Sequence, residues 1–325
     1  MPATAPPIVV QRDRYRAARE LCRKRSPDLF FASHFAAKTQ RYALYVLDAM
    51  AHQLDEIMGP PQVGTNPPAI VSAQAASCCS SGSCEGESIA QRQQVCLAVI
   101  DHLLGGLETG KPELDAFLDV QPKLELPRVW FEQWIAGLAS ERSLPRYATW
   151  KRLSETIGAS GGVPSLLAAR VLASHGEFSA VAESQFLAWG SAIRLCAALA
   201  NIGEDWKHGR VLLPLDDLIK HHLTEKDIAT FTQQGTSRGD DRWLSLMQFE
   251  LDRIRNLFRG GAKALSALND EGARRTFTAT GVFAMRRLEK LVKTGGDSFA
   301  MKVTMSTFER LASMPRVVRM VWEAK

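Results

Sequence analysis

Apolar residues recur three and four positions apart along most of this chain, and this spacing constrains the fold more than any other feature. A helix turns once in about 3.6 residues, so side chains at these intervals share one helical face. Sustained alternation of β-branched residues, and hairpin turns of the Asn-Gly or Asp-Gly type, are nearly absent. The sequence therefore predicts an all-α fold. The expected helices cover residues 12–22, 28–58, 88–107, 112–119, 127–138, 147–157, 163–174, 180–206, 224–231, 240–268, 270–293 and 300–322.

The length of several expected helices favours one large bundle over two small ones, with residues 1–325 as a single domain. One segment breaks the pattern, because residues 59–87 are rich in Pro, Gly, Ser, Ala and Cys and carry almost no charge. Such a composition predicts a flexible insertion, either a lid or a disordered spacer. Its Cys78, Cys79 and Cys84 are expected to be free thiols, with a redox or metal clip as the alternative.

The chain is mildly basic, with a formal net charge of +5 and a pI near 8.9. Its Lys and Arg residues are spread along the sequence, which argues against nucleic acid as a partner. The same mild positive charge would suit either weak peripheral contact with an anionic membrane or binding of an anionic ligand. The first residues lack the apolar core of a signal peptide, and no run of 18 apolar residues occurs. We therefore expect a cytoplasmic protein.

Two segments carry a resemblance to a known family. Residues 26–59, SPDLFFASHFAAKTQRYALYVLDAMAHQLDEIMG, lead through Arg41 and an aromatic residue into an acidic motif. Residues 189–214, WGSAIRLCAALANIGEDWKHGRVLLP, carry a second acidic motif followed by Gly-Arg, a few apolar residues and Leu-Pro. These features resemble the two aspartate-rich helices of the squalene/phytoene synthase family. The chain is similar to a phytoene-synthase-like member in which both motifs are altered.

The resemblance implies a single all-α bundle around a central cavity. Family members use Mg²⁺ to bind and ionise an allylic isoprenyl diphosphate, and a double bond, usually of a second isoprenoid, captures the carbocation. Carboxylates four residues apart lie on one helical face and can hold such an ion through their oxygens. We therefore expect Mg²⁺ as the cofactor and an allylic isoprenyl diphosphate as a substrate.

The first motif is altered at its second carboxylate. Asp55 matches the first metal-binding aspartate and is followed by Glu56, so both are candidate Mg²⁺ ligands, but Gly59 stands at the second position. Asp48 and His52 lie on the same helical stripe as Asp55, since they precede it by seven and three residues. This stripe predicts a rebuilt metal or proton-transfer site, with Asp48 and His52 as catalytic residues. The alternative is an internally paired polar face.

The second motif keeps one aspartate. Asp205 matches a metal ligand and Asn201 replaces its partner, so both are candidate Mg²⁺ ligands with reduced affinity. Arg194 lies on the same face as Asn201, where a guanidinium could bind a diphosphate and replace part of the metal charge. A salt bridge to a neighbouring carboxylate is the alternative for Arg194. The resemblance also assigns diphosphate contacts to Arg41 and Arg210.

Loss of two carboxylates argues against a metal cluster that binds two diphosphates at once. The leading hypothesis is a Mg²⁺-dependent prenyltransferase that ionises one allylic diphosphate and transfers the prenyl group to a small-molecule acceptor without a diphosphate. An indole or phenol type of acceptor would fit a secondary-metabolism role. Two alternatives remain open: a non-catalytic binding or assembly factor that retains the fold, and ordinary head-to-head condensation of the squalene or phytoene type.

Overall fold

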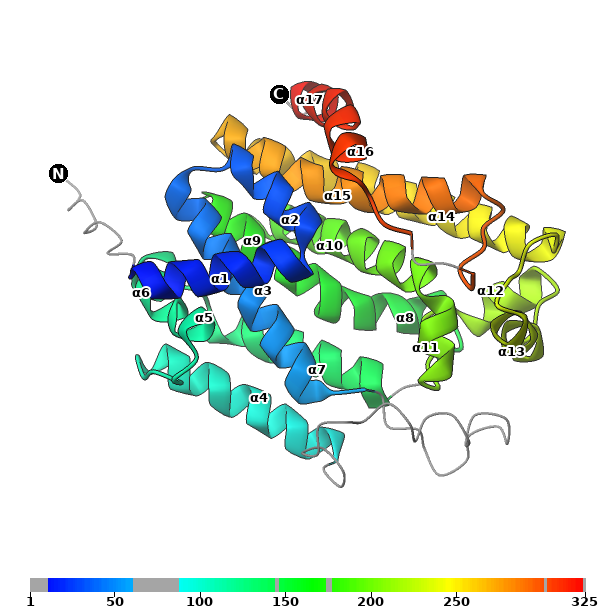
Figure 1. Ribbon diagram of the computed structural model, residues 1–325, viewed down its shortest axis with the longest axis horizontal. Helices are drawn as coiled ribbons and strands as arrows, with labels where there is room; N and C mark the ends of the chain where they lie inside the picture. Colours follow the sequence, from blue (N-terminus) through cyan, green and yellow to red (C-terminus); the bar gives the residue numbers. More distant parts are fainter. Residues whose placement is uncertain (1–10, 61–87, 144–145, 174–176, 301–302, 324–325) are drawn as a thin grey trace.

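The computed structural model describes residues 11–60, 88–143, 146–173, 177–300 and 303–323. Across these ranges the regular structure is helical, and one isolated backbone bridge joins Tyr147 to Pro214. The helices pack side by side as a bundle (Figure 1). The prediction of an all-α fold is confirmed. Beyond Pro60, the expected insertion and its three cysteines lie outside the described residues.

The observed helices follow most of the expected ones, although those at 28–58, 112–119, 180–206 and 300–322 are divided and a helix at 215–220 was not expected. The first part of the chain forms α1 Arg12–Arg25, α2 Pro27–Ala32, η1 Ser33–Phe35, α3 Lys38–Met58, α4 Ile89–Leu104, α5 Pro112–Asp115, α6 Phe117–Leu124, α7 Arg128–Ser143, α8 Trp150–Ile157, η3 Gly158–Gly162 and α9 Val163–Ala173. The remainder forms α10 Ala180–Ala200, α11 Ile202–Lys207, α12 Leu215–Lys220, α13 Glu225–Gln234, α14 Asp241–Ala262, η4 Lys263–Ala267, α15 Glu271–Lys293, α16 Thr307–Ala312 and α17 Met314–Glu323.

Helix α10 occupies the interior of the bundle, where it packs against α9, α14, α15 and the π-helical turn η3 (Figure 1). Its Trp189 is fully buried and contacts Phe258 of α14 and Phe277 of α15, with ring centroids 4.8 and 5.5 Å apart. Large aromatic side chains contribute most of the apolar area in such contacts. The apolar pattern at residues 180–206 therefore marks a helix surrounded by others, as expected from its composition.

Helix α3 ends at Met58 and is capped by Gly59. The backbone conformation of Gly59 explains why the second carboxylate of the first motif is absent. Gly59 has a φ of 62° and a ψ of −170°, a conformation that is essentially restricted to glycine. A Cβ atom there would lie 2.7 Å from Nη1 of Arg92, which donates to the carbonyl of Met58 at 2.9 Å. An aspartate at this position would be strained and would no longer continue the helical face.

Glycines allow three backbone segments to approach one another closely in the middle of the bundle. A Cβ atom on Gly190 of α10 would lie 2.3 Å from the carbonyl oxygen of Gly161 in η3. A Cβ atom on Gly137 of α7 would lie 2.5 Å from the backbone nitrogen of Ser160, also in η3. Real Cβ atoms do not tolerate such distances. The π-helical turn is therefore held between α7 and α10. Turns of this kind are often found at functional sites.

Replacing Gly190 by alanine is expected to lower the free energy of unfolding by about 1–3 kcal/mol, because the new methyl group meets backbone atoms that cannot move aside. Gly260 on α14 provides a matched control, since a Cβ atom there would have no neighbour within 4 Å. Gly260→Ala is expected to be neutral or to stabilise the helix by up to about 1 kcal/mol. Urea denaturation of both variants measures the difference. Equal stability of the two would contradict the close approach.

The stretch Trp150–Ala173, which spans α8, η3 and α9, is long and apolar enough to cross a membrane. However, 61% of its most apolar window is buried inside the bundle, as expected of a core helix. Within the described residues, this stretch is therefore better explained as a core segment than as a membrane span.

Candidate functional site

A fully buried carboxylate, Glu141 on α7, lies at the centre of a charged cluster. Arg194 of α10 donates to it through Nε at 2.9 Å and through Nη2. Nη1 of Arg210 and Nη1 of Arg142 lie 3.5 and 3.6 Å from its Oε2. Ser160 of η3 also donates its hydroxyl to Glu141. Among the described residues, three guanidiniums thus converge on one carboxylate, held there by the close packing of α7, η3 and α10.

Two further carboxylates extend this cluster to the acidic motifs. Arg142 donates through Nη2 to Asp55 of α3, and its Nε donates to the carbonyl of Gly59 at 3.3 Å. Arg210 donates through Nη2 to Asp205 of α11. We call Asp55, Glu141, Arg142, Arg194, Asp205 and Arg210 the arginine–carboxylate network. It joins α3, α7, α10 and α11 through charge-assisted hydrogen bonds.

The charges of Glu141 and Arg194 are fixed at neutral pH. Burial raises the pKa of Glu141, but Arg194, Ser160 and Arg210 offset this effect and hold its pKa at about 2. Burial lowers the pKa of Arg194, yet Glu141 above all, with Asp205 and Asp55, raises that pKa above its usual value. Arg142, which binds Asp55, and Arg210, which binds Asp205, both approach Glu141, so the two acidic motifs meet at one site.

A second polar cluster joins Asp48 and His52 of α3 to Ser26. The Ser26 hydroxyl donates to Oδ1 of Asp48 at 2.7 Å and lies 3.1 Å from Nε2 of His52. The same Nε2 lies 3.6 Å from Oδ2 of Asp48, whose side chain is 9% exposed. This Oδ2 atom is buried and has no hydrogen-bond partner among the described residues. Burial raises the pKa of Asp48, while Ser26 and His52 oppose that rise.

Asp48 lies on the wall of an apolar pocket with a volume of about 140 Å³. The other lining residues come from α2, α3, α7 and α9, and include Trp134 and Leu167. On α3, Asp55 of the network follows Asp48 by seven residues, and on α7 Glu141 follows Trp134 by the same interval. Two helical turns rise about 10 Å. Along both α3 and α7, the network residue therefore follows the pocket residue by about 10 Å of helix rise.

The structure places six of the nine residues expected at the site in two separate clusters. Asp55, Asp205, Arg194 and Arg210 meet in the network, and the alternative for Arg194, a salt bridge to a carboxylate, is the one observed. Asp48 and His52 are neighbours, as their spacing on the helix predicts. Whether these residues bind or react with a substrate stays a prediction.

Arg41 lies outside the network and contacts the backbone, and its expected contact with a diphosphate stays a prediction. It donates to the backbone carbonyls of Ser33 at 3.1 Å, His34 at 3.0 Å and Ala36 at 3.2 Å. These carbonyls belong to η1 and the turn after it, where the chain leaves α2 and has no helical partner for them. Arg41 therefore stabilises this turn, because its guanidinium donates hydrogen bonds to carbonyls that have no helical partner.

The expected Mg²⁺ ligands do not fit a metal site in this arrangement. Asp55 and Asp205 are each paired with an arginine, and Nδ2 of Asn201 donates to the carbonyl of Ala197 at 2.7 Å. Glu56 is exposed. Within the described ranges, no three side chains of the His, Cys, Asp or Glu type gather so that they could hold a metal ion. Tertiary pairing with arginines has replaced the carboxylate clamp that the motifs suggested.

Glu141 and Arg142 are central to the site but were not among the expected residues. Both lie in the last turn of α7, beyond the expected helix 127–138, and both are buried, which is unusual for charged residues unless they are paired. An adjacent Glu-Arg pair at the end of such a helix is the signal that could have identified them. Ser26 precedes the helix α2 and could not be assigned a partner from spacing alone.

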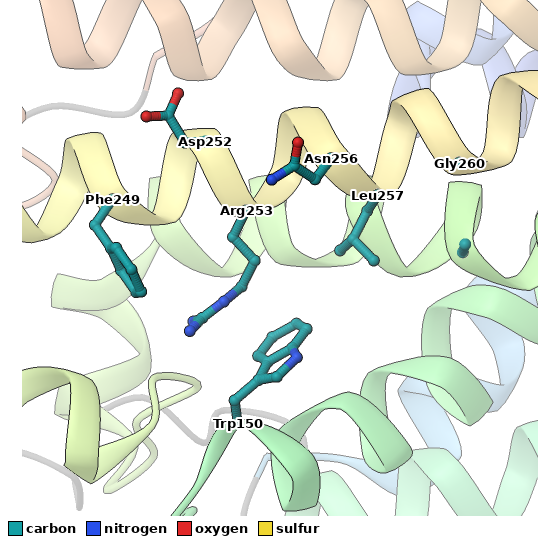
Figure 2. Close-up of a pocket in the computed structure, with 8 residues that line it drawn as sticks. Trp150, Phe249, Asp252, Arg253, Asn256, Leu257 and Gly260 are labelled. Atoms are coloured by element: carbon teal, nitrogen blue, oxygen red, sulfur yellow. The ribbon is translucent and has the colours of Figure 1, made fainter.

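A separate surface pocket of about 520 Å³ lies between α14, α10 and the first residue of α8. Figure 2 shows Arg253 reaching from α14 towards Trp150 with Phe249 beside it, and its guanidinium carbon lies 4.3 and 4.8 Å from their ring centroids. Arg253 also pairs with Asp217 and Glu250, at 2.7 and 2.6 Å. Two carboxylates thus face one guanidinium here, whereas three face three guanidiniums in the network, so this pocket offers less to an anion than the network does.

Comparison with known proteins identifies the family. The family model described as squalene/phytoene synthase matches residues 22–309. The chain belongs to the squalene/phytoene synthase family. A 15-cis-phytoene synthase of Synechocystis sp. is 25% identical over 291 residues, covering 85% of this chain and 76% of its own. A 15-cis-phytoene synthase of Synechococcus elongatus is 26% identical over 243 residues, covering 71% and 77%.

Solved structures of the family share the fold. A dehydrosqualene synthase in complex with a ligand superposes with a TM-score of 0.76 at 15% identity, covering 95% of this chain and 97% of that one. The squalene synthase HpnC from Alicyclobacillus acidocaldarius gives a TM-score of 0.69 at 17% identity, covering 89% and 97%. Members of the squalene/phytoene synthase family are prenyltransferase-type enzymes of isoprenoid biosynthesis, and the chain is placed among transferases on that basis.

Proposed function

We propose that this member of the squalene/phytoene synthase family ionises one allylic isoprenyl diphosphate and transfers the prenyl group to an acceptor that carries no diphosphate. One observation carries the proposal: on both α3 and α7, a residue of the arginine–carboxylate network follows a residue of the apolar pocket by two helical turns, a rise of about 10 Å. A diphosphate at the network would leave its hydrocarbon chain directed into the pocket. Three guanidiniums face three carboxylates, so even one diphosphate requires a carboxylate to leave its arginine, and two diphosphates are favoured less.

The reaction begins when the allylic C–O bond breaks and the bonding electron pair leaves with the diphosphate. In this proposal Arg194 and Arg210 stabilise the negative charge that develops on the leaving oxygens, because guanidiniums in a water-poor site act strongly on such charge. The acceptor then donates an electron pair to the allylic carbon. The proton that the acceptor must lose passes to Asp48 or His52, the titratable pair at the wall of the pocket.

Head-to-head condensation of two isoprenyl diphosphates is the second candidate. The family match and the relatives named as phytoene synthases favour this reaction over transfer to an aromatic acceptor. The network supports it less, because Asp55 and Asp205 are engaged by arginines and leave fewer groups for a second diphosphate. A non-catalytic role remains the third possibility, in which the two polar clusters only stabilise the core.

Product analysis distinguishes the three candidates. Purified protein is incubated with dimethylallyl, geranyl, farnesyl or geranylgeranyl diphosphate, with and without indole or phenolic acceptors, in Mg²⁺ and in EDTA. We expect diphosphate release that increases when an acceptor is present, and a product with one prenyl group. A hydrocarbon built from two prenyl groups would establish the second candidate. No diphosphate release in any combination would refute the proposal and leave the non-catalytic role.

A further inference from the structure

The ion pair between Arg142 and Asp55 joins a buried cation to a solvated anion. The Arg142 side chain is 7% exposed, whereas that of Asp55 is 62% exposed. An exposed carboxylate can return to water at little cost, because ion pairs with solvent-exposed groups contribute about 0–1 kcal/mol. A buried guanidinium cannot be solvated in this way, so it requires an anion beside it. Asp55 is therefore the exchangeable partner in this pair.

The rest of the network keeps a positive charge when Asp55 leaves. The three guanidiniums then face two buried carboxylates, Glu141 and Asp205, so one charge is uncompensated. Nε of Arg210 is also buried and has no hydrogen-bond partner among the described residues. Both the charge and a spare donor for an incoming anion are thus already present next to Arg142.

We infer that Asp55 is an internal anion that a diphosphate replaces, so that Arg142, Arg194 and Arg210 bind the diphosphate without a divalent cation. The identity of the anion rests on the proposed function; the exchange itself rests on the burial of the two partners. A cation bound by Asp55 and Asp205 would require both carboxylates to leave their arginines. It would also place two further positive charges beside three guanidiniums, which Coulomb repulsion disfavours.

The inference reverses the expected effect of one substitution. If Asp55 competes with the diphosphate, Asp55→Asn removes the competitor and tightens binding of inorganic pyrophosphate by about threefold to tenfold. If Asp55 is a metal ligand, the same variant weakens binding. Arg142→Gln is expected to weaken binding by about tenfold to a hundredfold, the effect of losing a charged hydrogen bond. Isothermal titration calorimetry of the full chain with pyrophosphate, in EDTA and in Mg²⁺, measures each affinity.

Asp101→Asn is the matched control, because Asp101 on α4 pairs with Arg128 at 2.6 Å on the surface and should leave pyrophosphate affinity unchanged. Wild-type binding in EDTA within about tenfold of that in Mg²⁺, with tighter binding by Asp55→Asn, supports the inference. Binding only in Mg²⁺, weaker binding by Asp55→Asn, or no binding at all overturns it. Circular dichroism confirms that each variant is folded. The product assay tests the proposed function separately, since turnover in Mg²⁺ would survive failure of the inference.

Discussion

Replacing Glu141 by glutamine is expected to lower the free energy of unfolding by about 3–5 kcal/mol, because it removes the carboxylate on which three guanidiniums converge. Glutamine has nearly the same shape, so the loss reports charge rather than packing. Glu132→Gln is the matched control on the same helix, since Glu132 is 40% exposed and pairs with Arg128 at the surface. That variant is expected to lose less than about 1 kcal/mol. Similar losses in both variants would contradict the central role of Glu141.

The same carboxylate predicts how stability depends on pH. The pKa of Glu141 is about 2 in the folded protein against an ordinary value of 4.5. A lowered pKa of an acid contributes stability that is present above the ordinary value and is lost as the pH falls towards the folded value. Stability contributed by Glu141, roughly 3 kcal/mol, should therefore disappear between pH 4.5 and about 2. Denaturation of wild type and Glu141→Gln across this range should show convergence of the two at low pH.

Replacing Asp48 by asparagine is expected to lower the rate of product formation by about 10²–10⁴-fold, the usual contribution of a general base. Stability should change by less than about 1 kcal/mol, because asparagine keeps the shape and can still accept the hydrogen bond from Ser26. Rates under saturating substrate, together with thermal unfolding of each variant, provide the measurement. A loss of stability without a loss of rate would make Asp48 a structural residue.

The pH dependence of the rate gives an independent readout of Asp48. Burial raises its pKa above the ordinary value of 3.8. A base must be deprotonated to act, so the rate should rise with pH through a value above 3.8 in the wild type. Asp48→Asn should lose this acid limb, whereas the control Asp101→Asn should keep it. Persistence of the limb in Asp48→Asn would assign it to another group.

The helical fold could be predicted from the sequence because its cause is local. Apolar residues at helical intervals identify the buried face of each helix whatever surrounds it. Divisions inside long helices were harder to predict: the break at Asn201 separates α10 from α11 without a proline or a glycine at that residue. At this break the Asn201 side chain donates to the carbonyl of Ala197 at 2.7 Å, and such local hydrogen bonds compete with the helical ladder.

The candidate site was predictable only in part, because many of its contacts join residues that are far apart in the sequence. Spacing along a single helix placed Asp48 and His52 together, since residues four apart are neighbours on a helix. Their partner Ser26 lies 26 residues before His52 and could not be assigned in that way. The sequence thus identified the helical faces that carry charge. It did not identify the residues that these faces contact across the bundle.

The amino-acid sequence alone determined the all-α fold, the family and the two helices that carry the acidic motifs. Only the tertiary structure decided what the surviving aspartates contact. Arg142 reaches Asp55 across 87 residues of sequence, and Arg194 reaches Glu141 across 53. Helix formation follows from hydrogen bonds between residues four apart, whereas the pairing of a buried charge depends on which side chain the fold places beside it. For that reason the motifs predicted a metal clamp, and the structure shows carboxylates bound by arginines.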